Sequence, residues 1–211
     1  MHFRNRADAG RTLAGLLAKY AARPDVIVLG LPRGGVPVAA EVARALGAPL
    51  DVCLVRKLGV PGHSEFAMGA ISEGGVSVLN EDVIRSLAIP AVLVDRTRER
   101  ERVELERRNR LYRGSRPPPM LHARTVILID DGLATGSTME AAILALRLLG
   151  PARIVAAAPV GARESCDRIG RIADVIVCPA MPDPFNAVGL WYDDFAETSD
   201  EEVQNLLNGT I

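Results

Sequence analysis

The run VILIDDGLATGSTM, residues 126–139, constrains the fold of this chain more than any other feature. Four apolar residues typical of a buried strand lead directly into two carboxylates, Asp130 and Asp131. A loop of small and hydroxylated residues follows. Helical spacing then predicts a helix whose apolar face holds Ala141, Leu144, Ala145 and Leu148. A buried strand, a short loop and a helix in this order are the building unit of α/β proteins.

The loop in this run has the chemistry of a phosphate site. A helix N-terminus offers free N–H groups and the positive end of the helix dipole, which favour an anion. Gly136 lets the backbone close around a phosphate, and neighbouring Thr and Ser side chains add hydroxyl donors. Asp130 and Asp131 repel a phosphate, so they are placed to accept hydrogen bonds from sugar hydroxyls or to hold a divalent cation through water. The run therefore predicts a site for a sugar 5-phosphate.

Further strands and helices alternate along the chain. Apolar patterns predict strands at 26–29, 51–55, 126–129, 154–158 and 175–177, with helices at 7–21, 36–47 and 163–169 among them. Continuous apolar strands that alternate with helices indicate a parallel-sheet core flanked by helices on both faces. Ligands of such sheets bind beyond the carboxyl ends of the strands. The loops that follow Gly30, Val55 and Ile129 are therefore expected to meet at one edge.

Composition limits the classes of function. A chain of 211 residues suits a single domain over 1–211, and 48% hydrophobic residues support a sizeable core. A formal charge of −1 gives no electrostatic case for nucleic acid or an anionic membrane. The N-terminus lacks the apolar stretch of a signal peptide, and three scattered cysteines do not suggest a disulfide framework. We therefore expect a cytoplasmic protein with no nucleic-acid or membrane partner.

The central run resembles the phosphoribosyl pyrophosphate (PRPP) motif of the type I phosphoribosyltransferases. That motif has four apolar residues, two acids, a variable stretch, Thr-Gly and a small or hydroxylated pair. The resemblance implies a Mg²⁺-dependent enzyme that binds the PRPP ribose on Asp130 and Asp131, with Asp131 among the catalytic residues. It implies that the 5-phosphate lies on a loop formed by Ala134, Thr135, Gly136, Ser137 and Thr138.

The segment Leu31–Gly35 resembles the pyrophosphate loop of the same family. The resemblance implies that Arg33 and the N–H groups of Gly34 and Gly35 bind the pyrophosphate. In the family this loop often contains a non-proline cis peptide. Arginine suits the role because it is permanently charged and can bind two oxygens. Arg56 and Lys57 follow the strand 51–55, either as solvated charges at a strand end or, as we favour, as catalytic cations.

An insertion is expected at about 60–119. Residues 58–75 resemble the mobile catalytic loop of the family, while 66–71 and 76–79 are typical of a hairpin. Asn80 is placed to cap a short helix that ends at Leu87, and a long charged helix is expected over Ala91–Arg113. Its arginine-rich part, 95–113, is interpreted as a solvated, salt-bridged surface. The alternative is a lid or dimer arm whose arginines approach the phosphates.

Residues 178–198 resemble the base-binding hood of purine phosphoribosyltransferases. Half of the aromatic residues of the chain lie here, and the resemblance gives Phe185 and Trp191 to the acceptor. We expect Phe185 and the Trp191–Tyr192 pair to form one wall of the acceptor pocket. Packing of the C-terminus is the alternative interpretation of these aromatic residues. The resemblance also gives the metal to Asp130, Asp131 and Asp193, with Asp194 as the alternative to Asp193.

The acceptor is not defined by the sequence. Hypoxanthine–guanine transferases carry a third acid where this chain has Ala134, so their base chemistry is not expected here. The resulting hypothesis is transfer of a 5-phosphoribosyl group from PRPP to a nitrogen acceptor, with release of pyrophosphate, by a homodimer. A non-catalytic PRPP or nucleotide sensor of the same fold is the rival hypothesis.

Overall fold

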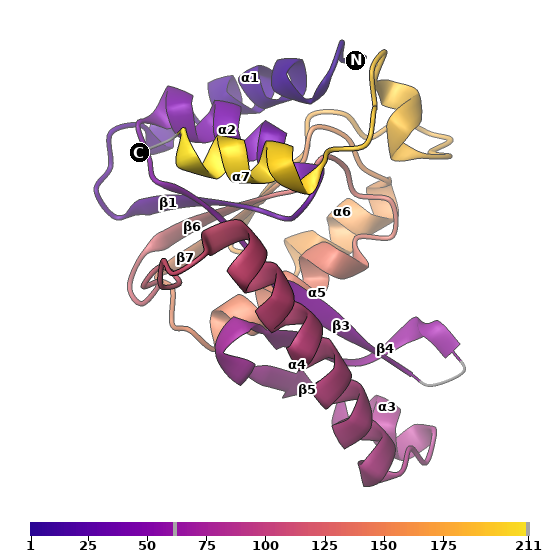
Figure 1. Ribbon diagram of the computed structural model, residues 1–211. Coiled ribbons are helices and arrows are strands. Elements are labelled where there is room, and N and C mark those ends of the chain that lie inside the picture. The colour runs from indigo at the N-terminus through magenta and orange to yellow at the C-terminus, as the bar shows by residue number, and fades with distance from the viewer. Residues whose placement is uncertain (61–62, 210–211) are drawn as a thin grey trace.

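A five-stranded sheet forms the centre of the computed structural model, which describes residues 1–60 and 63–209 but not the side chains of 63–66 and 74 (Figure 1). All neighbouring strands are parallel, in the order β2-β1-β6-β7-β8. Their bounds are Leu50–Val52 (β2), Val26–Gly30 (β1), Thr125–Ile129 (β6), Arg153–Ala157 (β7) and Val175–Val177 (β8). The predicted parallel-sheet core is confirmed.

Helices cover both faces of this sheet because its strands are apolar on both sides. Ile127 and Ile129 of β6 pack with α1 (Arg6–Leu16) and α2 (Gly35–Leu46), whereas Val126 and Leu128 pack with α5 (Ser137–Arg147) and α6 (Arg163–Gly170). The first helix is shorter than predicted, since a 3-10 turn over Ala18–Tyr20 follows α1. The C-terminal helix α7 (Asp200–Asn208) lies beside α2 (Figure 1).

The predicted apolar face of α5 is wrong in part. Leu144 and Leu148 are 39% and 58% exposed. The side chains that α5 presents to the sheet recur at helical spacing a few positions away, at Met139, Ile143 and Leu146. Three alanines lie among these side chains, so the periodicity of apolar residues did not determine which face of the helix is buried.

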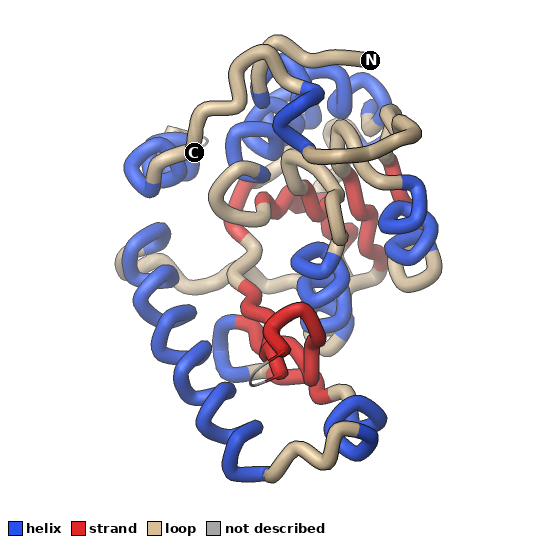
Figure 2. Tube along the Cα trace, turned by 90° about the vertical axis from the view of Figure 1, so that its right-hand side faces the viewer, coloured by secondary structure: helices blue, strands red, loops and turns tan. Residues whose placement is uncertain are grey.

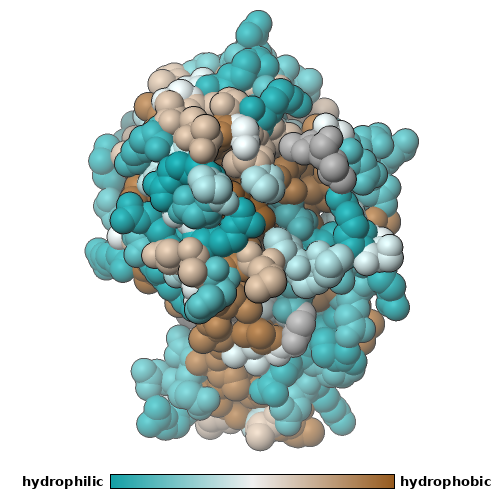
Figure 3. All heavy atoms as spheres, turned by 90° about the vertical axis from the view of Figure 1, so that its left-hand side faces the viewer, coloured by the Kyte–Doolittle hydropathy of each residue, from teal (hydrophilic) through white to brown (hydrophobic). Residues whose placement is uncertain are grey.

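A separate lobe is inserted between β2 and β6. Its antiparallel sheet has the order β3-β4-β5, and the 3-10 turn Glu73–Gly75 joins β4 to β5 (Figure 2). The lobe contains β3 (Val55–Val60), β4 (His63–Ser72), β5 (Ser77–Leu79), α3 (Glu81–Ser86) and α4 (Ala91–Arg113). Hydrophobic residues gather in the lower half of the face seen in Figure 3, at the level of this lobe. The predicted hairpin and long helix are confirmed.

The lobe begins at Val55, earlier than the expected start at about residue 60, and one predicted strand is therefore wrong. Residues 51–55 do not form a single strand: β2 ends at Val52 and β3 begins at Val55. The chain leaves the parallel sheet between them, so Arg56 and Lys57 lie within β3 and pair with Ile71 and Ala70 of β4. The stretch expected to be a mobile loop is therefore mostly hairpin. Among the described residues, no helix is both long and apolar enough to cross a bilayer.

The segment 178–198, which we call the hood, contains the 3-10 turn η3 (Val188–Trp191). The N-terminus completes it. The Phe3 N–H donates to the Trp191 carbonyl at 2.9 Å, the Asp193 N–H donates to the Phe3 carbonyl at 2.9 Å, and the Phe3 and Tyr192 ring centroids are 5.6 Å apart. The N-terminal residues thus lie against the hood (Figure 1).

Candidate active site

Two adjacent carboxylates stand at the carboxyl end of the central strand β6. The Asp131 N–H donates to Oδ1 of Asp130 at 2.9 Å. Burial and the neighbouring Asp131 charge raise the pKa of Asp130 well above its ordinary value. Burial also raises the pKa of Asp131, although Arg6 opposes this effect. Carboxyls in such surroundings favour a partner that brings hydrogen-bond donors or positive charge.

Arg6 supplies part of that positive charge. Its Nε and Nη2 both lie 2.8 Å from Oδ2 of Asp131, and its side chain is only 12% exposed. The same guanidinium donates to the Ala196 carbonyl at 2.6 Å and lies 4.0 Å from the ring centroid of Phe195. Arg6 therefore joins the acid pair to the hood. No sequence pattern indicates this role, because an arginine in a charged first helix does not reveal its distant partner.

The loop after the two acids has the local structure of a phosphate cup. Gly136 caps α5 with a φ of +66°, in the left-handed region that glycine tolerates best. The Thr135 and Ser137 hydroxyl oxygens are 3.1 Å apart at the start of the helix. Ala134, Thr135 and Thr138 are exposed and Ser137 is half-buried, so an anion can reach these groups from solvent.

Helix α6 holds this loop from behind. The Ser165 hydroxyl donates to the Ala134 carbonyl at 2.5 Å, and Arg168 donates to the Thr135 carbonyl. A Cβ on Gly136 would lie 3.3 Å from the Ser165 Cβ, so this glycine also permits the close approach of α6. Ser165 and Arg168 were not identified from sequence. Their i,i+3 spacing places them on one side of α6, but nothing in the sequence links that side to the loop.

The pyrophosphate-like loop 31–35 has the predicted backbone. The Pro32–Arg33 peptide is cis. The Gly35 N–H donates to the Leu31 carbonyl at 3.0 Å. Both the Gly34 and the Gly35 N–H groups were expected to face pyrophosphate. Since the Gly35 N–H is already bound within the loop, the expectation now applies to the Gly34 N–H alone.

The two glycines of this loop bring it against the acid pair. A Cβ on Gly34 would lie 2.0 Å from Oδ2 of Asp131, and a Cβ on Gly35 would lie 2.6 Å from the Ile129 carbonyl oxygen. Any side chain at either position would collide with the end of β6. The loops that follow β1 and β6 thus meet as predicted, and the glycines are required for their contact.

Arg33 has partners in the C-terminal segment. Its guanidinium contacts Glu197, and Nη1 lies 3.9 Å from Oδ1 of Asp200. The Tyr112 hydroxyl donates to the same Asp200 oxygen at 2.5 Å. These acids hold Arg33 at the rim of the site.

A cavity of about 330 Å³ brings several of the predicted residues together. Pro32 of the pyrophosphate-like loop, Arg56 and Lys57 of β3, and Ser137 and Thr138 of α5 all line it. Residues predicted from two separate stretches of sequence therefore share one cavity, whereas Arg33, the two glycines of the pyrophosphate-like loop and the acid pair do not line it.

The interior of the hood is filled by its own side chains. A Cβ on Gly132 would lie 2.4 Å from Cγ1 of Val188, so Val188 covers the backbone beside Asp131. The buried Tyr192 hydroxyl donates to the Asp131 carbonyl at 2.6 Å. Burial raises the pKa of Tyr192, which keeps it protonated as a donor. Tyr192 therefore supports the acid pair instead of forming the pocket wall that the aromatic pattern suggested.

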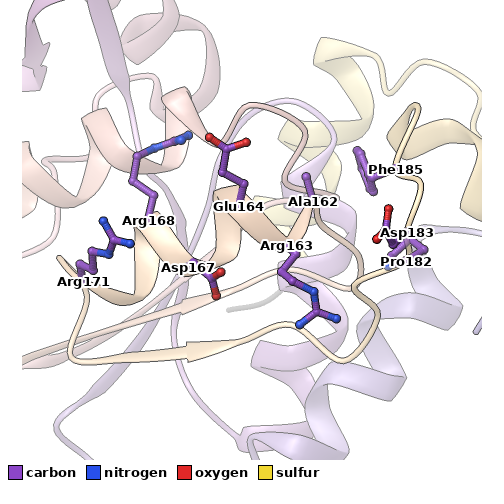
Figure 4. Close-up of a pocket in the computed structure, with 9 residues that line it drawn as sticks. All are labelled: Ala162, Arg163, Glu164, Asp167, Arg168, Arg171, Pro182, Asp183 and Phe185. Atoms are coloured by element: carbon purple, nitrogen blue, oxygen red, sulfur yellow. The ribbon is translucent and has the colours of Figure 1, made fainter.

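Phe185 lies elsewhere on the hood. It is half-buried against the hood cluster and, with Pro182 and Asp183, faces the start of α6 across a groove of about 530 Å³ (Figure 4). Arg168 and Glu164 project from one side of α6 in this view (Figure 4). Trp191 also packs partly buried against the hood, and its Nε1 is buried with no hydrogen-bond partner in the described part of the chain.

The three carboxylates assigned to the metal do not gather into a cluster. Asp193 is 65% exposed, with Oδ1 3.2 Å from Nδ1 of His2, and Oδ1 of Asp194 accepts from the Ala196 N–H at 3.0 Å. Among described residues, no group of three His, Cys, Asp or Glu side chains is placed to hold a metal ion. Asp130 and Asp131 remain suited to Mg²⁺, which binds through one or two carboxylates and the phosphates of a substrate.

A parallel sheet whose edge carries two acids, a hydroxyl-rich helix start and a cationic cavity defines an α/β protein of the sugar-phosphate-binding class. Residues 62–193 match the phosphoribosyl transferase domain family. The chain is 47% identical over 206 residues to the Mycobacterium tuberculosis (strain CDC 1551 / Oshkosh) protein named "Putative phosphoribosyl transferase MT0597". This chain belongs to the phosphoribosyl transferase family.

Other similarities agree with that assignment. The chain spans about half of the Mycobacterium tuberculosis relative, since the match covers 98% of this chain and 46% of the relative. The crystal structure of TT1426 from Thermus thermophilus is 46% identical, covers 98% of both chains and has a TM-score of 0.90. The AQ2163 protein from Aquifex aeolicus is 13% identical, covers 96% of this chain and 84% of its own, and shares the fold with a TM-score of 0.53.

Proposed function

We propose that this protein transfers the 5-phosphoribosyl group of PRPP to a nitrogen acceptor of nucleobase type and releases pyrophosphate. The observation that carries the proposal is the contact between the loops after β1 and β6, in which Gly34 lies directly against the Asp131 carboxylate. A substrate with a diphosphate and a ribose on adjacent atoms suits two such loops. The 5-phosphate then occupies the hydroxyl-rich loop 134–138.

In this proposal Asp130 and Asp131 accept hydrogen bonds from the ribose hydroxyls. The acceptor nitrogen attacks C1 while the bond from C1 to the pyrophosphate oxygen breaks, and the electron pair of that bond leaves with pyrophosphate. The ribose becomes cationic in the transition state, so the buried carboxylates stabilise it and the nearby cations stabilise the leaving group. Positioning and electrostatics, without covalent catalysis, account for the rate.

Mg²⁺ would enter with the phosphates of PRPP and neutralise part of their charge. Asp130 and Asp131 fit this role as a pair, because burial and the neighbouring Asp131 charge raise the pKa of Asp130, and a cation beside the two carboxylates would offset their repulsion. Asp193 is not included, since it lies on the exposed side of the hood against His2. A cytoplasmic location, expected from the composition and the N-terminal sequence, and a homodimer both remain proposals.

A non-catalytic PRPP sensor is the second candidate, and one observation favours it. Val188 fills the space over Gly132 beside the ribose position, where an acceptor would have to approach C1. A sensor needs no such space. An enzyme requires the hood to move or the acceptor to enter from the phosphate side.

Pyrophosphate release decides between these two functions. The protein is incubated with PRPP, Mg²⁺ and a panel of purines, pyrimidines and other nitrogen heterocycles, with Asp130→Asn as the inactive control. Acceptor-dependent pyrophosphate release by the wild type alone supports the transferase. PRPP binding without release for any acceptor supports the sensor.

A further inference from the structure

The cavity of about 330 Å³ is shared between the parallel sheet and the inserted lobe. One wall comes from the loops of the proposed PRPP site, and the opposite wall comes from β3 and α4. The full set of lining residues is Leu31, Pro32, Cys53, Leu54, Val55, Arg56, Lys57, Leu105, Arg108, Ser137, Thr138 and Ala141. Helix α4 therefore reaches the site through Leu105 and Arg108.

The charged side chains that line this cavity are all positive. Arg56, Lys57 and Arg108 line it together with the hydroxyls of Ser137 and Thr138, and none of its described lining residues is acidic. The groove between the hood and α6 differs, because acids and arginines alternate along it. Three cations and two hydroxyl donors around an enclosed space suit a phosphate group.

Glu104 orients Arg108 toward the cavity. Its Oε1 accepts from Nε of Arg108 at 2.8 Å, and its other contacts are with Arg107. These two arginines lower the pKa of Glu104 to about 2, so it stays ionised and balances only one of their two charges. The Arg108 side chain is 28% exposed and the Arg107 side chain 56%. Arg108 has further N–H donors beyond the one bound to Glu104.

The position of α4 is fixed by packing. Leu105 and Tyr112 are buried with Leu58 and Met68 in the core of the inserted lobe. Glu101, also nearly buried, accepts from Nε of Arg56 at 2.7 Å. Helix α4 thus positions Arg108 in the wall of the cavity and, through Glu101, also orients Arg56.

We propose that Arg108 is a substrate-binding residue, which completes a phosphate-binding cavity together with Arg56 and Lys57. The inference rests on the proposed function, since the phosphate belongs to PRPP. It adds a second source of positive charge: Arg33 contacts Glu197 at the rim of the site, and the inserted lobe supplies three further cations, two of which are oriented by Glu101 and Glu104. The helix 95–113 is then more than a solvated surface.

Calorimetric titrations of three probes test this role without an acceptor. PRPP, inorganic pyrophosphate and ribose 5-phosphate are titrated, with Mg²⁺, into wild type, Arg108→Ala and Arg107→Ala. Arg107 is the matched control, because it binds the same Glu104 but does not line the cavity. We expect Arg108→Ala to weaken PRPP at least tenfold and Arg107→Ala to change it less than twofold. Arg108→Lys should recover part of the loss.

The two smaller probes identify which end of PRPP the cavity holds. A parallel loss for pyrophosphate assigns the diphosphate, and a parallel loss for ribose 5-phosphate assigns the 5-phosphate; either supports the proposal. Unchanged PRPP affinity in a folded Arg108→Ala protein overturns it, as does an equal loss in Arg107→Ala. If the wild type binds none of the probes, the proposed function itself fails.

Discussion

The phosphate loop and the hood lie on either side of the Asp130–Asp131 pair, and they differ in what occupies the space beside it. On the phosphate side, Thr135 and Thr138 are exposed and a cationic cavity adjoins them. On the hood side, Val188 covers Gly132. The space proposed for PRPP is open to solvent, whereas Val188 occupies the space between the hood and Gly132. We therefore expect acceptor choice to depend on the packing of the hood.

The largest effect is expected where the two sides are joined. Arg6→Ala leaves the Asp131 carboxylate, which is only 16% exposed, without its partner and should lower the free energy of unfolding by about 3 kcal/mol. Arg4→Ala is the control, since its pair with Asp8 is exposed. Urea denaturation of both variants measures the difference. Equal stabilities would mean that Arg6 does not hold the two sides together.

A second variant tests whether the hood side is tightly filled. Gly132→Ala places a methyl group against Val188 and should destabilise the fold by about 2 kcal/mol. Val188→Ala removes the obstacle, so the double variant should recover more than half of this loss. Thermal and urea unfolding of the wild type, the two single variants and the double variant give the four free energies of this double-mutant cycle. Purely additive effects would contradict the close contact.

A variant at Phe185 tests whether this side chain contacts the acceptor or only packs within the hood. If its exposed face contacts the acceptor, Phe185→Ala raises the acceptor KM about tenfold, or about 1.4 kcal/mol, with PRPP affinity unchanged. Steady-state kinetics with the acceptor found in the pyrophosphate assay measure this. Leu190→Ala, at an exposed hood position, is the control. Loss of stability with no change in KM would assign Phe185 to the hood core.

The smallest effect is a dependence of stability on pH. The pKa of Asp130 is raised in the folded state, so the folded protein binds its proton more tightly than the unfolded chain. The contribution of Asp130 to the free energy of unfolding is fully present below the ordinary pKa of Asp, near 3.8. It is lost as the pH rises through the higher pKa that Asp130 has in the folded protein. Asp130→Asn should therefore be the more stable protein at neutral pH. Urea midpoints at several pH values measure the change, and a less stable variant at neutral pH would show that Asp130 serves the fold.

Sequence patterns predicted the elements that carry a strong local signal. The strand before Asp130, the charged helix over Ala91–Arg113 and the cis peptide after Pro32 all appear as expected. Each depends on residues that are contiguous in sequence. The split of the predicted strand 51–55 was missed, because Cys53 and Leu54 are apolar and give no sign that the chain leaves the sheet.

The residues that sequence patterns did not indicate act across long separations. Arg6 reaches Asp131, Ser165 reaches Ala134, and Arg168 reaches Thr135. Arginine and serine are common on helix surfaces, so only the packing of the helices distinguishes these residues. The role of the hood aromatics was ambiguous for the same reason, since the sequence alone does not distinguish buried Tyr192 from half-buried Phe185.

The most direct measurement is calorimetric titration of PRPP with Mg²⁺ into wild type and Asp130→Asn. Asp130 is chosen over Asp131 because its replacement leaves the Arg6–Asp131 pair in place. We predict binding to the wild type and at least a 100-fold weaker affinity for the variant, about 2.7 kcal/mol, with an unchanged circular dichroism spectrum. Equal affinities, or no binding of PRPP to the wild type, would contradict the proposed role of the acid pair.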